Sequence, residues 1–362
     1  MVALPSRRPS YGYEHDAASK EEILMKLQRL LRAGGIETGL VRKLLQALFA
    51  AVGDDAQYDA QQLLLDSVVE DRVCSAYPPP YRQKQQLYRE LLKFIDDGSV
   101  SDVHDALYSA LALGVSQPTS ENEELFAGHF TLQLRSGGYV VLRHCTQMGG
   151  GLETGGRLWA AGCAVVGLCD AGALDGLLHG HVLELGAGTG LAGLALASRG
   201  APVTRVTLTD GVGTTLANLR YNAEASGSLA DTVPVSIELL EWEAEETPAF
   251  AETVDVILGC DVMYDERSAP ALARVLRRFL EPPGGTAEAA VLAVMRRSSE
   301  VFAEFLEAFR GEGLACEAVA FPAAACDAAR DWLCLAGEPA ERAAKVGQAI
   351  EVLRVTWAAH LA

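Results

Sequence analysis

The chain has 362 residues, 49% of them hydrophobic and 22% charged, so we expect a packed globular protein with room for two domains. Its net charge of −18 argues against general nucleic-acid binding, and no apolar run reaches the roughly 18 residues of a membrane span. None of the eight cysteines forms a Cys-x-x-Cys pair, which argues against a metal site, and the N-terminus lacks the apolar core of a secretory signal. These features predict a cytoplasmic protein without membrane contacts, and we expect a monomer.

Residues 21–114 are predicted to be helical throughout. In "EEILMKLQRLLRAGG" the apolar residues recur at the spacing of one helix face and stop at two glycines. Similar runs follow at 37–53, 58–71, 81–98 and 101–114, and "AYPPPYR" separates the third from the fourth because proline disfavours helix. The polar segment "SQPTSENEE" predicts a boundary between an all-helical N-terminal domain over 1–120 and a second domain over 121–362.

The second domain is predicted to begin with a β-hairpin over 128–145 and to continue as alternating strands and helices. Expected strands lie at 181–185, 204–209, 235–240, 254–259, 289–295, 315–321 and 349–357, and helices at about 157–170, 190–199, 213–226, 267–280 and 298–312. This order predicts an α/β, Rossmann-like, doubly wound sheet that binds ligands at the carboxyl ends of its strands. The linker 322–348 shows no clear crossover helix, so we expect the final strand to run antiparallel.

The stretch "HVLELGAGTGLAGLALASRG" (181–200) reads as an apolar strand, a glycine-rich turn and a helix, which is typical of a cofactor loop. A dinucleotide would use 188–193 as its Gly-x-Gly-x-x-Gly motif, which leaves Gly186 unfavourably inside the strand. In the other register the strand ends at Leu185, and Gly186-Ala187-Gly188-Thr189-Gly190 forms the turn. The second register avoids a glycine in the strand interior.

Two carboxylates distinguish the candidate ligands. Glu184, at the end of the strand, would repel a pyrophosphate but suits a cation, and S-adenosylmethionine carries a sulfonium and an α-ammonium but no phosphate. Asp210 ends the next strand, 24 residues after Gly186, where it can accept hydrogen bonds from both ribose hydroxyls. These residues predict S-adenosylmethionine as the cofactor. An NAD-dependent oxidoreductase and a tight turn that binds no ligand are the alternatives.

The catalytic half resembles the seven-strand methyltransferases. "VLELGAGTGLAGLALA" is similar to their first motif, and "VDVILGCDVMYD" (254–265) resembles the Asp-x-x-Tyr motif of their protein-lysine branch, here Asp261 and Tyr264. "LANLRYN", "LLEW" and "GGRLWAAGCAVV" resemble further elements of that branch. In the N-terminal half, "VCSAYPPPYRQKQQLYRELLK" (73–93) with the helix and hairpin after it is similar to the eukaryotic elongation factor 2 lysine methyltransferases. The resemblance covers about 20–312 and the final strand.

The resemblance implies a role for each motif residue. It places the cofactor against Trp159, the turn of Gly186, Ala187, Gly188 and Gly190, and the residues Glu184, Asp210, Trp242 and Cys260. Trp242 would lie by the adenine and Asp210 would hold the ribose. Cys260 stands where the family usually has alanine, and the insertion 322–348 resembles nothing familiar. Trp159 and Tyr264 can also be read as ordinary structural residues.

These patterns together predict a protein-lysine methyltransferase that acts on elongation factor 2. We expect Asp261 to steer or orient the acceptor amine rather than to act as an obligatory base, and Tyr264 to form a wall of its channel. We expect the helical domain to dock the protein substrate, and the linker 322–348 and the hairpin to flank the substrate lysine. Methylation of another protein or a small amine, and a catalytically silent interaction module, are the alternatives.

Overall fold

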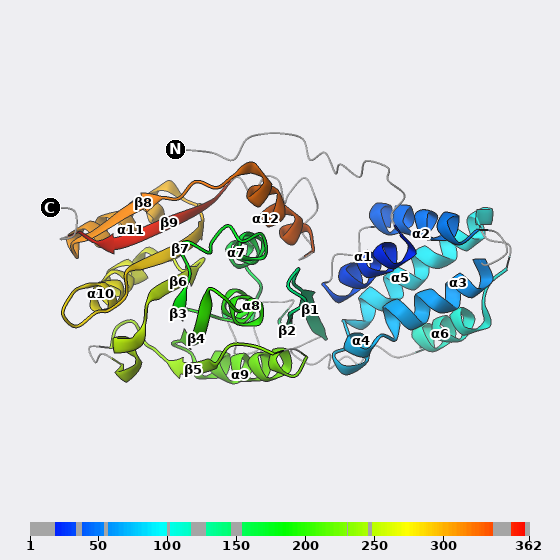
Figure 1. Ribbon diagram of the computed structural model, residues 1–362, viewed down its shortest axis with the longest axis horizontal. Helices are drawn as coiled ribbons and strands as arrows, with labels where there is room; N and C mark the ends of the chain where they lie inside the picture. Colours follow the sequence, from blue (N-terminus) through cyan, green and yellow to red (C-terminus); the bar gives the residue numbers. More distant parts are fainter. Residues whose placement is uncertain are drawn as a thin grey trace.

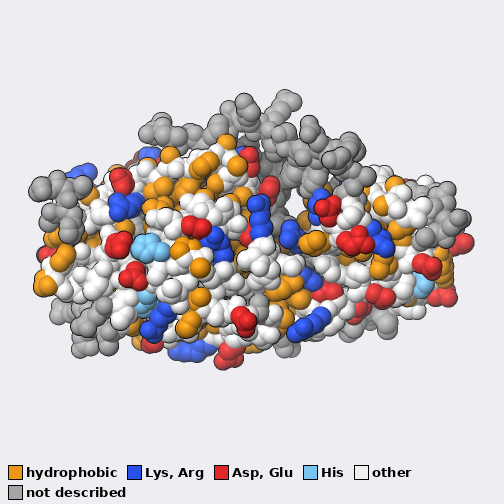
Figure 2. Space-filling model, viewed as in Figure 1, with side chains coloured by type: hydrophobic (Ala, Val, Ile, Leu, Met, Phe, Trp, Pro, Cys, Tyr) orange, Lys and Arg blue, Asp and Glu red, His pale blue; other side chains and the backbone are white. Residues whose placement is uncertain are grey.

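The computed structural model describes residues 19–33, 38–53, 57–99, 102–116, 128–145, 154–229, 231–244, 248–335 and 349–358. Figure 1 shows the helices of residues 20–116 at one end of an elongated molecule, a large sheet with its helices at the other, and a two-stranded hairpin between them. Basic and acidic side chains are interspersed on the same face in Figure 2. The predicted domain boundary at 120/121 lies outside the described residues.

The N-terminal helices pack around a hydrophobic core of their own, which includes Leu27, Leu45 and Leu91. They are α1 (Lys20–Arg32), α2 (Thr38–Val52), α3 (Gln57–Leu64), η2 (Leu65–Val69), α4 (Arg72–Ala76), α5 (Tyr81–Phe94), η3 (Ile95–Ser99) and α6 (Asp105–Ser116). A capping box between Ser19 and Glu22 starts α1. No described helix is long and apolar enough to cross a membrane.

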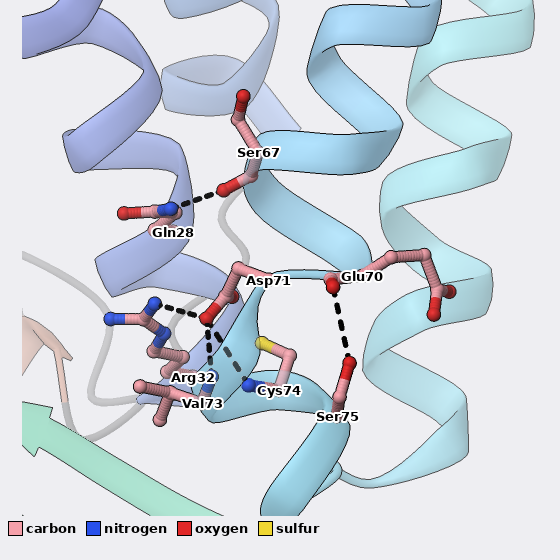
Figure 3. A network of polar contacts seen from close by, with 8 residues as sticks. All are labelled: Gln28, Arg32, Ser67, Glu70, Asp71, Val73, Cys74 and Ser75. Carbon is pink, nitrogen blue, oxygen red and sulfur yellow. Dashed lines mark hydrogen bonds and ion pairs between the residues drawn. The ribbon is translucent and has the colours of Figure 1, made fainter. Parts of the chain in front are cut away.

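The helix that was predicted over 58–71 is present as α3 and η2, and a polar network marks the point after it where Asp71 starts the short helix α4 (Figure 3). The Asp71 carboxylate accepts hydrogen bonds from the backbone N–H groups of Val73 and Cys74, at 2.7 and 3.3 Å. It also pairs with the buried Arg32 guanidinium at 2.5 Å. Asp71 therefore caps α4 and ties it to the end of α1.

The hairpin joins the helical part to the sheet. Its strands β1 (His129–Gln133) and β2 (Tyr139–Arg143) are antiparallel, as predicted. The His129 N–H donates to the Pro78 carbonyl at 2.9 Å. On the other side, the N–H of Val141 donates to the Ser226 hydroxyl at 2.9 Å and that of Arg143 to the Asn222 amide oxygen at 2.8 Å. Backbone N–H groups of the hairpin thus connect it to the helical part on one side and to side chains of the helix at 213–227 on the other.

The sheet confirms the predicted seven-strand architecture, with the order β5-β4-β3-β6-β7-β9-β8. Its strands are β3 (Gly180–Leu185), β4 (Val203–Asp210), β5 (Val235–Leu239), β6 (Val256–Cys260), β7 (Ala289–Met295), β8 (Leu314–Ala318) and β9 (Ile350–Trp357). Its helices are α7 (Ala160–Asp170), α8 (Leu191–Arg199), α9 (Gly213–Gly227), η4 (Ala249–Thr253), η5 (Glu266–Ser268), α10 (Ala269–Leu280), α11 (Ser299–Gly311) and α12 (Ala323–Leu335). As predicted, β9 is antiparallel to its neighbours β7 and β8.

Alternating residues of the central strands face two separate cores. Val182 and Leu258 belong to the core with α7, α8 and α12, whereas Leu183 and Ile257 belong to the core with α10 and α11. This alternation follows from the two-residue period of a strand. It leaves the carboxyl edge of the sheet, where the loops emerge, for the site.

One expectation about the linker 322–348 is wrong: its first half forms the helix α12. This helix packs so closely on α7 that a Cβ at Gly167 would lie 2.5 Å from the Ala329 backbone. Trp332 is buried in the same contact. The alanine-rich run after Pro322 carried this signal, and burial against α7 stabilises the helix. Residues 336–348 lie outside the described chain.

Candidate active site at the carboxyl edge of the sheet

A cavity of about 410 Å³ lies at the carboxyl ends of β3, β4, β5 and β6. All but one of the predicted site residues line it: Trp159, Glu184, Gly186, Ala187, Gly188, Asp210, Trp242, Cys260, Asp261 and Tyr264. Gly190 does not line the cavity. Among the described residues of the hairpin and of 322–335, none lines it either, and their expected place beside the substrate lysine stays a prediction.

The glycine turn adopts the register that excludes a glycine from the strand. β3 ends at Leu185, and Gly186 and Gly188 follow with φ of 59° and 56°, a left-handed conformation that favours glycine. The Ala187 N–H donates to the Thr209 carbonyl at 2.8 Å, which anchors the turn to the end of β4. Two cavity-lining glycines are therefore required by the backbone conformation itself.

Gly190 has a structural position instead of a place in the cavity wall. It begins α8 with φ of 82°, and a Cβ there would lie 2.4 Å from the buried Leu219 side chain. Gly193, one turn later, lets α8 approach the sheet, since its Cβ would meet Leu208 at 2.3 Å. These two glycines set the distance between α8, α9 and the sheet.

Gly190→Ala is expected to destabilise the protein by about 3 kcal/mol, of which about 1 kcal/mol is left-handed strain and the rest is overpacking against Leu219. Gly137→Ala is the comparison, because Gly137 also has a positive φ, 89°, but has no atom within 4 Å of the added Cβ. Denaturant unfolding of both variants measures the difference. Equal losses would show that the contact with Leu219 costs nothing.

Glu184 is buried at the end of β3 and already has a protein partner. Its Oε2 accepts a hydrogen bond from the Gly193 N–H at 2.9 Å, which ties α8 to the strand. Burial raises the pKa of Glu184 to about 8, with a further contribution from the Asp210 charge and an opposing one from the Gly193 hydrogen bond. The sequence suggested a fixed negative charge here, whereas the structure predicts a carboxyl group that is mostly protonated at pH 7 until a cation enters.

Asp210 holds two turns together at the end of β4. Its Oδ2 accepts from the Gly188 N–H at 3.1 Å and its Oδ1 from the Val212 N–H at 3.0 Å. Burial raises the pKa of Asp210, and these backbone hydrogen bonds oppose that shift. The carboxylate therefore fixes the glycine turn and the approach to α9, while its remaining lone pairs are available to a ligand in the cavity.

Trp159 lies between two arginines that sequence reasoning missed. The guanidinium carbons of Arg157 and Arg297 are 5.5 and 5.2 Å from the centre of its ring. Its indole N–H donates to the Thr154 carbonyl at 3.0 Å, so the ring has a fixed orientation. Both arginines also line the cavity. Arg157 stands two residues from the predicted Trp159, but no local pattern connects Arg297 to it.

Asp261 has a strained backbone, and each of its two carboxylate oxygens accepts a hydrogen bond from the protein. Alone among the described non-glycine residues it has a positive φ, 58°. Its Oδ1 accepts from the Met295 N–H at 3.2 Å, and its Oδ2 pairs with Arg297 at 2.7 Å. Burial raises the pKa of Asp261, and the Arg297 charge acts against that shift. Tyr264, three residues on, is 52% exposed, so the cavity meets solvent beside this pair.

The lining of the cavity fits a cationic nucleoside better than a dinucleotide. It has five acidic residues (Glu184, Asp210, Glu241, Glu243 and Asp261) and two basic ones (Arg157 and Arg297), an excess of three potential negative charges. Such a lining disfavours a pyrophosphate. The buried Thr215 hydroxyl also lines the cavity and has no hydrogen-bond partner among the described residues, so a polar ligand can satisfy it.

The reversed last strand, the glycine register and this acidic cavity define an S-adenosylmethionine-dependent methyltransferase. The family described as lysine methyltransferase matches residues 142–312. Protein-lysine N-methyltransferase EEF2KMT of Homo sapiens is 28% identical over 246 residues, which cover 65% of this chain and 71% of the relative. Protein-lysine N-methyltransferase EFM3 of Chaetomium thermophilum is 26% identical over 264 residues, 67% of this chain and 77% of the relative. Residues 142–312 thus match the lysine methyltransferase family, and the chain is a protein-lysine N-methyltransferase that uses S-adenosylmethionine.

Proposed function

We propose that this enzyme methylates a lysine of eukaryotic elongation factor 2 in the cytoplasm. The observation that carries the proposal is the opening of the cavity beside Asp261 and Tyr264, through which a side chain of a large substrate can enter. The resemblance of residues 73–93 to the elongation factor 2 enzymes supports this substrate. Seven cysteines in the described residues are free thiols, which suits a reducing compartment.

In this proposal the residues that line the inner cavity hold the cofactor. Asp210 accepts hydrogen bonds from the ribose, Trp242 lies by the adenine, and Trp159, Cys260 and the glycine turn contact the remainder. Glu184 provides negative charge for the cationic end. When bound, S-adenosylmethionine supplies a methyl group that its sulfonium has already activated for displacement. The protein therefore contributes mainly positioning and the protonation state of the acceptor.

The acceptor must reach the cavity as a neutral amine. For a lysine with the usual pKa near 10.4, losing the proton costs roughly 4 kcal/mol at pH 7.4. Tyr264 forms an aromatic wall at the mouth of the cavity, and the positive charge of a bound sulfonium would disfavour the ammonium form. Asp261 accepts a hydrogen bond from the amine and so directs its lone pair toward the methyl group. The proton leaves to solvent at the open side of the cavity.

The direct test incubates purified elongation factor 2 with the enzyme and labelled S-adenosylmethionine, followed by peptide mapping of the product. Label on one lysine is the expected result. Label in a cell lysate on a different protein or on a small amine, with none on elongation factor 2, would instead support those alternative acceptors. Calorimetric titration with S-adenosylmethionine separates both outcomes from a silent module, which would give no binding heat.

We also propose that the helical part docks the protein substrate. Its hydrogen-bonded connection to the hairpin, and through the hairpin to α9, links it to the domain that carries the cavity. Docking outside the cavity predicts that intact elongation factor 2 has a lower KM than a short peptide that contains the same lysine. Equal KM values for the two substrates would contradict a docking role.

Cofactor affinity is expected to increase with pH up to about pH 8. The pKa of Glu184 is about 8 in the free protein, and a bound cation favours the carboxylate, so its pKa in the complex is lower. Between these two values binding releases a proton, and Kd falls by up to about tenfold per pH unit before it levels off. Calorimetry across this range measures the effect, and Glu184→Gln is expected to lose it. A flat wild-type profile contradicts the assignment.

The same residue is expected to lower the stability of the free protein as pH rises. Its pKa is raised on folding, so the stabilising preference for the protonated form is complete below the unfolded pKa of about 4.5 and is lost as pH increases through about 8. Thermal unfolding without cofactor should therefore show the wild type losing stability relative to Glu184→Gln from about pH 5 to about pH 8, with no further change above that pH. If the melting temperatures of the wild type and Glu184→Gln change with pH in the same way, the pKa of Glu184 is not raised by folding.

A further inference from the structure

The ion pair between Asp261 and Arg297 lies at the opening of the cavity beside Tyr264, where the acceptor lysine is proposed to enter. Arg297 follows β7 and immediately precedes Ser298, the N-cap of α11. Its Nη2 lies 2.7 Å from Asp261 Oδ2, at the end of β6, and its guanidinium stands over the Trp159 ring. The Arg297 side chain is 43% exposed, whereas that of Asp261 is 4% exposed. The arginine is thus the solvent-facing member of the pair.

An unpaired carboxylate at this position would oppose methyl transfer. The acceptor nitrogen forms the new bond to carbon with its lone pair while the carbon–sulfur bond breaks and that electron pair stays on sulfur. The amine must therefore lose its proton to solvent first. A nearby negative charge favours the ammonium form, and a nearby positive charge favours the neutral amine. Asp261 can orient the amine without favouring the ammonium only if its charge is balanced.

We propose that Arg297 is a positioning residue that holds Asp261 in place, balances its charge and so allows the acceptor lysine to react as a neutral amine. The inference deepens the proposed function and rests on it, because it concerns the lysine acceptor of that same reaction. Guanidinium suits this role since it remains charged throughout the working pH range, whereas a histidine or lysine could lose its proton.

Other charged and titratable groups around the pair do not provide this balance. They are Arg157 before α7, Glu184 and Cys260 at the ends of β3 and β6, Glu241 and Glu243 after β5, and Tyr264. Arg157 lies over Trp159, and none of these groups is hydrogen-bonded to Asp261. Arg296, which precedes Arg297 in the chain, pairs with Glu351 on β9 at 3.2 Å instead. Arg297 is therefore the cation in direct contact with the Asp261 carboxylate.

The test compares kcat/KM between pH 6 and 10 for the wild type and three variants, with purified elongation factor 2 as the acceptor. Arg297→Met removes the charge but keeps the length, and is expected to move the acidic limb of the profile up by about one pH unit. This is a loss of about tenfold at pH 7 that recovers at high pH. Arg297→Lys keeps a positive charge and is expected to return most of the profile to that of the wild type. Arg296→Met is the matched control and is expected to give the wild-type profile.

Two results overturn the inference. If the Arg297→Met profile falls by the same factor at every pH, the residue is only structural, and if the profile coincides with the wild type, the residue has no role in the reaction. Calorimetry should show that Arg297→Met still binds S-adenosylmethionine, so that a change in the pH profile is not a loss of the cofactor cavity. A wild type that transfers no methyl group to elongation factor 2 overturns the proposed function, a result distinct from an active enzyme whose acidic limb does not move.

Discussion

Asp261→Asn is expected to lower kcat on saturating elongation factor 2 by about 100-fold, because a small displacement of the acceptor amine has an effect of that size. Asparagine is one of the few side chains that tolerate a left-handed backbone, so the variant keeps the φ of 58° and isolates the carboxylate. Its single amide oxygen accepts from Arg297 or from Met295, and its NH₂ group is turned toward the other of these two donors, so the side chain is held less firmly. Initial rates at saturating cofactor measure the change.

Asp265→Asn is the matched control for this prediction. Asp265 belongs to the same loop and pairs with Arg267 at 2.7 Å, but it does not line the cavity. Its replacement should leave kcat unchanged, since an exposed ion pair contributes little. Full activity of Asp261→Asn on saturating substrate would show that the carboxylate does not orient the amine.

Asp210→Asn is expected to raise the Kd for S-adenosylmethionine by about 100-fold. The carboxylate accepts from two backbone N–H groups, those of Gly188 and Val212, whereas an amide offers one oxygen and turns a donor toward the other group. Loss of a buried charge-assisted hydrogen bond costs about 1.5–3 kcal/mol, and the contact with the ribose weakens as well. The glycine turn is then less ordered before the cofactor arrives.

Calorimetric titration of the purified variant with S-adenosylmethionine tests this expectation. Asp175→Asn provides the comparison, because Asp175 is paired with Arg199 at 2.5 Å and lies outside the cavity. That substitution should leave the Kd at the wild-type value. An Asp210→Asn protein that binds with unchanged affinity would exclude Asp210 from cofactor recognition and would reduce its role to the turn.

Local patterns in the sequence were sufficient for most of the fold. Strand and helix periodicities place all seven strands of the sheet, and the reversal of β9 was predicted from its linker. The helix α12 was missed, although "AAACDAARDWLCL" is rich in alanine, because its stability depends on packing against α7. A short helix is decided by its tertiary contacts more than by its propensity.

The candidate site likewise includes residues that the sequence predicts and residues whose place depends on tertiary contacts. The register that excludes Gly186 from the strand and the acid at the end of β4 are local patterns, and they place Asp210 at the cavity. Asp261 and Tyr264 were assigned through the resemblance of their motif, and both line the cavity. Gly190 was assigned to cofactor binding because it belongs to the same motif. Its actual contact is with Leu219 on α9, which no spacing of glycines reveals.

The sequence by itself determined the order of elements, the glycine turn and the acidic residues at the strand ends, because each depends on the dihedral preferences and periodicity of neighbouring residues. Only the tertiary structure decided which charges balance one another. Asp261 and Arg297 are 36 positions apart and meet because β6 and β7 are adjacent in the sheet. The raised pKa of Glu184 also depends on tertiary structure, because the carboxyl group is buried only when distant segments pack around it.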